Sequence, residues 1–133
     1  MTQEDKELLL KDLSARLPYG VKCHFKYGSA EGDVTLGCID NGVARFEYGW
    51  YGRFHVNIDA DYIKPYLRPM SSMTKKEINE FHKLRFIHVD YGLEPLQCVL
   101  SINEIDWLNS HHFDYRGLIE KGLALEAPEG MYK

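Results

Sequence analysis

The densest group of side chains able to do chemistry comprises His111, His112, Asp114, Tyr115 and Arg116. Imidazole, carboxylate, phenol and guanidinium groups together can move protons or hold an anion. This composition indicates a small enzyme or a binder of small ligands. A structural interpretation competes with it: a helix ends at the two histidines, whose cationic form suits its negative end, and Asp114 caps the next helix. Neighbouring residues of a helix point about 100° apart, so the two histidines are poorly placed to share one metal ion or substrate atom.

A second group of candidate residues is an aromatic loop that holds Trp50, Tyr51 and Arg53. Displayed Trp, Tyr and Arg side chains are typical anchors of protein interfaces. Three interpretations stay open: the rings pack on the protein's own sheet, they contact another protein, or they stack on single-stranded nucleic acid beside nearby arginines. The net charge over residues 43–68 is only +1, from four Lys and Arg against three Asp and Glu, which disfavours nucleic acid.

Familiar catalytic and metal-binding motifs are missing from the sequence. It has no HExxH, no paired CxxC, no GxSxG and no phosphate-binding P-loop, so we expect neither a metal nor a cofactor. The cysteines are Cys23, Cys38 and Cys98, an odd number without ligand spacing, which predicts reduced and buried thiols. A zinc site assembled across the fold from Cys23 or Cys38 and a histidine stays an alternative.

Length, charge and hydropathy limit the class of protein. A chain of 133 residues, 44% of them hydrophobic, is long enough to bury a core without a metal or disulfide. Its net charge of −4 disfavours a domain that coats DNA or RNA, because phosphate neutralisation needs basic residues. No apolar run approaches membrane-spanning length, and the polar N-terminus is no signal peptide. We therefore expect a cytoplasmic protein without a membrane partner.

Capping boxes predict where the helices that position these groups begin. Leucines at helical spacing extend the first helix to Pro18. The second helix is expected through Leu84, and residues 85–89 are either its end or a short strand. Asp114 is expected to cap a short fourth helix that ends at Gly122. The three boxes are Thr2 with Asp5, Thr74 with Glu77, and Ser101 with Glu104.

Alternating apolar residues predict strands over residues 21–27, 34–38, 43–48 and 53–58. Asn41-Gly42 indicates a tight hairpin, whereas residues 59–73, with two prolines, predict an extended connection. A closing strand is expected over residues 123–127. The predicted fold is one α+β domain over residues 1–133: an N-terminal helix, an antiparallel meander of about four strands, and two or three short helices packed on one face.

Three stretches of the sequence support a resemblance: residues 12–22 (DLSARLPYGVK), 63–74 (IKPYLRPMSSMT) and 107–119 (WLNSHHFDYRGLI), the last continuing to Met131. They resemble a family of small uncharacterised proteins encoded by gut anaerobes and their phages or other mobile elements. The resemblance spans both ends and the middle of the chain. It implies a phage-linked context and carries over no activity, ligand or catalytic residue.

Three functional hypotheses follow from these observations. The first is a non-enzymatic protein-interaction module, accessory to a phage or mobile element, that binds another protein through the aromatic loop of Trp50, Tyr51 and Arg53. The second is a small enzyme or small-ligand binder built on residues 111–116. The third is a weak binder of single-stranded nucleic acid. The oligomeric state is open.

Overall fold

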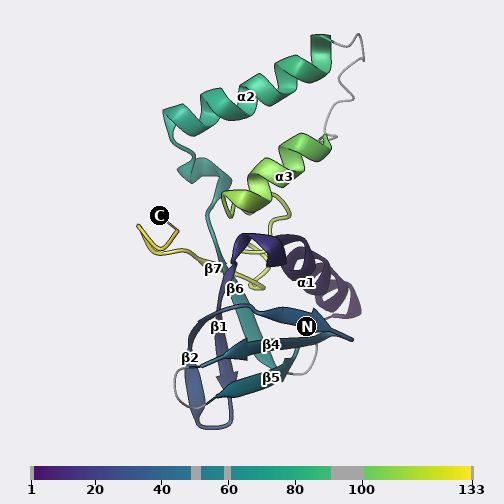
Figure 1. Cartoon of the computed structure of the whole chain (residues 1–133), viewed down its shortest axis with the longest axis vertical. Helices are drawn as coiled ribbons and strands as arrows, with labels where there is room; N and C mark the ends of the chain where they lie inside the picture. The colour runs from purple at the N-terminus through teal and green to yellow at the C-terminus, as the bar shows by residue number, and fades with distance from the viewer. Residues whose placement is uncertain (1, 49–51, 59–60, 91–100, 133) are drawn as a thin grey trace.

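The computed structural model describes residues 2–48, 52–58, 61–90 and 101–132, with only the backbone for 85–90. Figure 1 shows most of the strands grouped at one end of the molecule, and the helices of residues 75–90 and 102–110 at the opposite end. The described helices are α1 (Gln3–Arg16), α2 (Lys75–Asp90) and α3 (Ile102–Ser110), with 3-10 turns η1 (Leu17–Tyr19) and η3 (Met70–Ser72). The described strands are β1 (Lys22–Tyr27), β2 (Ala30–Thr35), β3 (Cys38–Asp40), β4 (Val43–Glu47), β5 (Arg53–Asn57), β6 (Tyr62–Leu67) and β7 (Leu125–Glu126).

The described strands form two sheets. One has the order β2-β1-β6-β7, in which only the short β7 runs parallel to its neighbour; the other is the antiparallel meander β3-β4-β5. The predicted α+β class is confirmed. Among the described residues, no helix has both the length and the apolar character needed to cross a membrane.

One hydrophobic core is shared by the two sheets and α1. Phe25 of β1 lies at its centre, with ring centroids 4.7 Å from Phe46 and 5.4 Å from Phe54 of the other sheet. Leu9 and Leu13 of α1 are buried in the same cluster. The apolar residues that alternate along β1 and β4 therefore point into the same core, and the opposite faces of both sheets carry polar side chains.

The capping boxes predicted from the sequence are all present. Thr2 and Asp5 exchange side-chain and backbone hydrogen bonds at the start of α1, and Ser101 and Glu104 do the same at α3. At α2, Thr74 and Glu77 form the third box. The helical backbone of α2 continues through Asp90, which shows that residues 85–89 are helix.

The strand predicted over residues 34–38 has the wrong bounds, and β6 was not predicted at all. Gly28-Ser29 form a two-residue turn, so β2 runs from Ala30 to Thr35, and Cys38 belongs to β3. The connection expected over residues 59–73 contains β6, which pairs with β1. Pro65 is tolerated there because β7 pairs only with Tyr66 and Leu67, so at Pro65 the strand has a described partner on one side only.

The predicted fourth helix is absent from the described residues 114–122, which form turns. Asp114 does cap this segment: its carboxylate oxygens accept from the amides of Leu118 at 2.9 Å and Ile119 at 3.0 Å. Gly122 adopts the left-handed backbone expected of it, with φ 74°. The segment ends after about one turn, too short for a helix to be stable by itself.

Helices α2 and α3 pack on each other rather than on the strands (Figure 1). Their contact is aromatic: the rings of Phe81 and Trp107 lie 5.4 Å apart, and Trp107 stacks on Phe113 at 5.8 Å. Leu108 is fully buried beside them. This second cluster is separate from the intersheet core.

Candidate functional site

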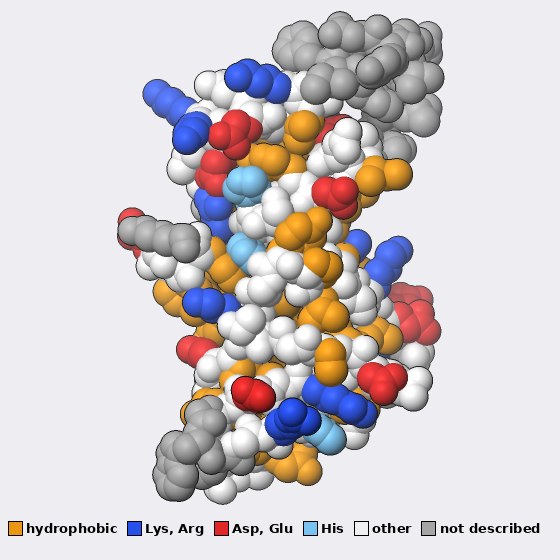
Figure 2. Space-filling model, in the orientation of Figure 1, with side chains coloured by type: hydrophobic (Ala, Val, Ile, Leu, Met, Phe, Trp, Pro, Cys, Tyr) orange, Lys and Arg blue, Asp and Glu red, His pale blue; other side chains and the backbone are white. Residues whose placement is uncertain are grey.

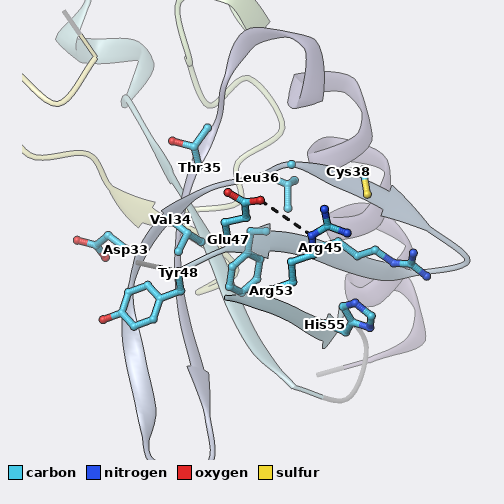
Figure 3. Close-up of a pocket in the computed structure, with 12 residues that line it drawn as sticks. Asp33, Val34, Thr35, Leu36, Cys38, Arg45, Glu47, Tyr48, Arg53 and His55 are labelled. Atoms are coloured by element: carbon cyan, nitrogen blue, oxygen red, sulfur yellow. Dashed lines mark ion pairs between the residues drawn. The ribbon is translucent and has the colours of Figure 1, made fainter. Parts of the chain in front are cut away.

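An open cavity of about 830 Å³ lies between the two sheets (Figure 3). We call it the intersheet groove. One wall is the chain from Asp33 to Cys38, along β2 and into β3. The other wall is β4 from Arg45 to Tyr48, with Arg53 and His55 of β5.

The two walls of the groove are held together at two points, one just after β2 and one just after β4. At one end the amide of Gly37 donates to the carbonyl of Arg45 at 2.9 Å. A Cβ atom on Gly37 would lie 2.9 Å from that same oxygen, so this crossing requires glycine. At the other end the Tyr48 ring lies over Gly32 and its hydroxyl donates to the carbonyl of Glu31 at 2.9 Å.

The groove has an apolar floor and a polar rim. Val34, Leu36 and Phe46 are buried at its base. Arg45 and His55 are exposed on the outer face of the meander, where they are directly paired across β4 and β5. Figure 2 shows basic, acidic and histidine side chains gathered over β4 and β5. Apolar floor and charged rim together are the usual anatomy of a protein-binding surface.

The arginines of the rim are only weakly engaged. Arg45 lies 3.6 Å from the carboxylate of Asp40. Arg53 lies 4.0 Å from that of Glu47, an ion pair drawn in Figure 3. The Arg53 side chain is 83% exposed. Exposed pairs at such distances contribute little energy, so a ligand carboxylate can replace either partner at low cost.

Of the aromatic-loop residues named from the sequence, Arg53 lines the groove. Trp50 and Tyr51 lie outside the described residues. Cys23 is buried as predicted, but the prediction for Cys38 is wrong, because it is exposed in the groove wall. The reason is that the chain crosses from one sheet to the other at Gly37, which interrupts the alternation of faces.

His111 and His112, from the candidate group of residues 111–116, lie in different surroundings. His111 is the C-cap of α3, as the structural interpretation predicted, and its ring stacks on Trp107 with centroids 4.1 Å apart. His112 is buried, has a left-handed backbone with φ 63°, and stacks on Tyr132 at 3.6 Å. Burial, reinforced by nearby cationic groups, lowers the pKa of His112 to about 4, so its imidazole is neutral at pH 7.

The remaining three residues of that group each bind a separate structural partner. Asp114 caps the following turn. The hydroxyl of Tyr115 donates to Asn109 at 3.0 Å, and Arg116 donates to Asp12 at 3.2 Å. None of these side chains lines the intersheet groove or either of two smaller hollows among the described residues. Their hydrogen bonds hold α1, α3 and the C-terminal segment together.

A buried ion pair in α1 was not predicted from the sequence. Arg16 and Asp12 are fully buried and 2.8 Å apart, and Arg16 also donates to the carbonyl of Phe113 at 2.6 Å. Burial raises the pKa of Asp12, and the guanidiniums of Arg16 and Arg116 oppose that rise. The sequence spacing could have indicated that Arg16 is buried, since Arg16 follows Leu13 by three residues and therefore lies on the same face of the helix.

A second charged cluster covers the outer face of β1, β2 and β6. His24 lies 2.7 Å from Asp33 and 3.1 Å from Glu31, and Tyr66 donates to Asp33 at 2.7 Å. Partial burial disfavours the imidazolium, but the two carboxylates outweigh it and raise the pKa of His24. The partners of His24 were not predicted, because they depend on the two-residue turn at Gly28-Ser29.

No family model, curated protein or solved structure matches this chain. Among the residues that the structure describes, no group of three or more His, Cys, Asp or Glu is placed to hold a metal ion. The fold and the site therefore define the class: a small α+β protein with an open groove between two sheets. The proposals that follow rest on the geometry of the described residues.

Proposed function

We propose that this chain is a non-enzymatic protein-interaction module that binds another protein through the intersheet groove and the adjoining aromatic loop. One observation carries the proposal: an open groove of about 830 Å³ lies directly beside the β4–β5 hairpin, with an apolar floor and two exposed arginines on its rim. The phage or mobile-element context stays a prediction from the resemblance.

Size and chemistry support this proposal. The volume falls within the range of about 300–1,000 Å³ that is usual for ligand sites. Arginine is enriched at interfaces because its planar guanidinium binds carboxylates and stacks on rings. The buried floor of Val34, Leu36 and Phe46 offers apolar contacts at the centre, where most interface energy is gained.

The alternative enzyme centred on residues 111–116 receives less support. Both oxygens of Asp114 accept backbone hydrogen bonds, and Arg116 is paired with the buried Asp12. These side chains have structural partners, and they do not converge on one cavity as a catalytic group would.

The test is an affinity capture from host lysate with two charge-matched variants. Arg45→Glu/Arg53→Glu reverses the groove rim, while Lys75→Glu/Lys76→Glu makes the same charge change at exposed positions of α2. Wild type and the α2 variant should retain the same specific bands, and the groove variant should lose them. Trp50→Ala/Tyr51→Ala tests the loop. Identical lanes from all proteins would contradict the proposal.

A further inference from the structure

We infer that His24 and Glu31 form a pH-sensitive switch on the outer face of the β1–β2 hairpin. When protonated, His24 holds the carboxylates of Glu31 and Asp33 together. When it loses the proton, it keeps Asp33 and releases Glu31, which moves to Lys26. The switch is a device of the fold that goes beyond the proposed function and does not depend on it.

Both ring nitrogens of His24 face a carboxylate. Nδ1 lies 2.7 Å from an oxygen of Asp33, and Nε2 lies 3.1 Å from an oxygen of Glu31. A neutral imidazole has one N–H group and one lone pair, whereas the imidazolium has two N–H groups. Only the protonated ring can therefore donate to both carboxylates, and a neutral ring would turn its lone pair toward one of them.

Glu31 is the carboxylate that the neutral ring releases. The contact of His24 with Asp33 is the shorter of the two. The carboxylate of Asp33 is also held by the hydroxyl of Tyr66, which donates to it at 2.7 Å. The remaining proton should therefore stay on Nδ1 of His24, beside Asp33, and Nε2 should lose its own.

The strand register provides the second position of the Glu31 side chain. Asp33 is directly opposite His24 across β1 and β2, whereas Glu31 is directly opposite Lys26 and reaches His24 along the diagonal. The Lys26 ammonium lies 3.5 Å from the same carboxylate oxygen that faces Nε2 of His24. Directly opposite charges across two strands attract each other. Glu31 can therefore move from His24 to Lys26 by rotation of its side chain, with the strand pairing unchanged.

The hydrogen-bonded partners of His24 keep their own protonation states near neutral pH. The hydrogen bond to His24 is the main cause that lowers the pKa of Glu31 and of Asp33, so both carboxylates stay charged. Burial, together with the bond to Asp33, raises the pKa of Tyr66 to about 12, so its hydroxyl keeps the proton that it donates. Of these four groups, His24 is the one whose charge changes. The other charged or titratable side chains on this face of β1 and β6 are Lys22, Lys26, Tyr62 and Lys64.

The switch lies at one end of the intersheet groove (Figure 3). The backbone carbonyl of Glu31 accepts from the Tyr48 hydroxyl, the contact that holds the two walls together there, and Asp33 is part of the groove wall. A change of pH therefore alters the charge beside the groove. The backbone contacts that hold its walls are kept.

An NMR titration of the whole chain from about pH 5 to about pH 9, across the usual range of histidine, tests the switch. Nε2 of His24 should lose its proton while Nδ1 keeps it, and the resonance of the Glu31 carboxyl carbon should shift with the same midpoint. Nuclear Overhauser contacts of Glu31 with Lys26 should strengthen above that midpoint, as those with His24 weaken. In His24→Gln the Glu31 resonance should no longer shift in this interval.

A charge-matched pair of variants isolates Glu31. Glu31→Gln should lower the pKa of His24 toward its ordinary value, because the ring loses one of its two carboxylates. Glu120→Gln makes the same charge change at an exposed position outside the sheets and should leave the pKa of His24 unchanged.

Four results would overturn the switch. They are a neutral His24 that carries its proton on Nε2, Glu31 contacts that stay the same across the midpoint, a Glu31 resonance that still shifts in His24→Gln, and equal effects of Glu31→Gln and Glu120→Gln on His24.

Discussion

The imidazole of His112 stacks on the ring of Tyr132, with centroids 3.6 Å apart and ring planes 15° apart. The Tyr132 hydroxyl accepts from the amide of Lys22 in β1 at 2.9 Å and donates to the carbonyl of Tyr66 in β6 at 2.7 Å. One side chain near the C-terminus thus connects the first sheet to the segment that follows α3. The stability of the whole molecule is expected to depend on it.

Tyr132→Phe should lower the free energy of unfolding by about 1–3 kcal/mol, because it keeps the ring stack but leaves two backbone groups without their partner. Urea unfolding followed by circular dichroism measures the loss. Tyr27→Phe is the matched control, since Tyr27 is 49% exposed and should change stability by less than about 0.5 kcal/mol. Equal effects of the two substitutions would contradict the assigned role of Tyr132.

His112 should make the protein sensitive to acid. Its pKa is lowered from 6.5 to about 4 in the folded state by burial and by nearby cations that include Arg16 and Arg68. The unfolded chain therefore binds a proton that the folded chain does not between these values, and stability falls as the pH drops from 6.5 toward 4.

The variant His112→Asn tests this dependence, because Asn tolerates a positive φ and does not titrate. Above about pH 7 it should be less stable than the wild type through loss of the stack, and the gap should narrow below the pKa of free histidine. A gap that stays constant from pH 7 to 4 would show that His112 is not responsible.

His24 should make the protein less stable as the pH rises, the opposite of the effect expected for His112. Its folded pKa is raised above 6.5, so the contacts with Asp33 and Glu31 stabilise the fold fully below that value and lose their effect as the pH rises through the raised pKa. His24→Gln should flatten this alkaline decline in thermal unfolding curves. If the variant keeps the wild-type decline, another group is the source.

The buried ion pair of α1 gives the largest expected effect. Asp12→Ala should cost about 3–5 kcal/mol, because it leaves the guanidinium of Arg16 buried without its carboxylate. Glu47→Gln removes one partner of an exposed pair and should cost about 0–1 kcal/mol. Denaturant midpoints compare the two; a similar small loss for both would mean that the Asp12 pair adds nothing net.

Local patterns in the sequence were enough to predict the α+β class and the residues at which the helices begin. Thr2, Thr74 and Ser101 act within one turn of themselves, so their capping boxes need no knowledge of the rest of the chain. The same holds for Asn41-Gly42, whose positive φ values of 50° and 73° suit the predicted hairpin.

The groove and its partners were decided by tertiary structure. The sequence named Arg53 as a binding residue, but nothing local indicates that Gly37 crosses to Arg45 and closes one end of a groove. His111 to Arg116 suggested one site because the residues are adjacent, yet their side chains contact several separate partners: α3 for His111 and Tyr115, Tyr132 for His112, and α1 for Arg116. Adjacency along a chain sets only local geometry, whereas shared surroundings arise from long-range packing that residue types alone do not encode.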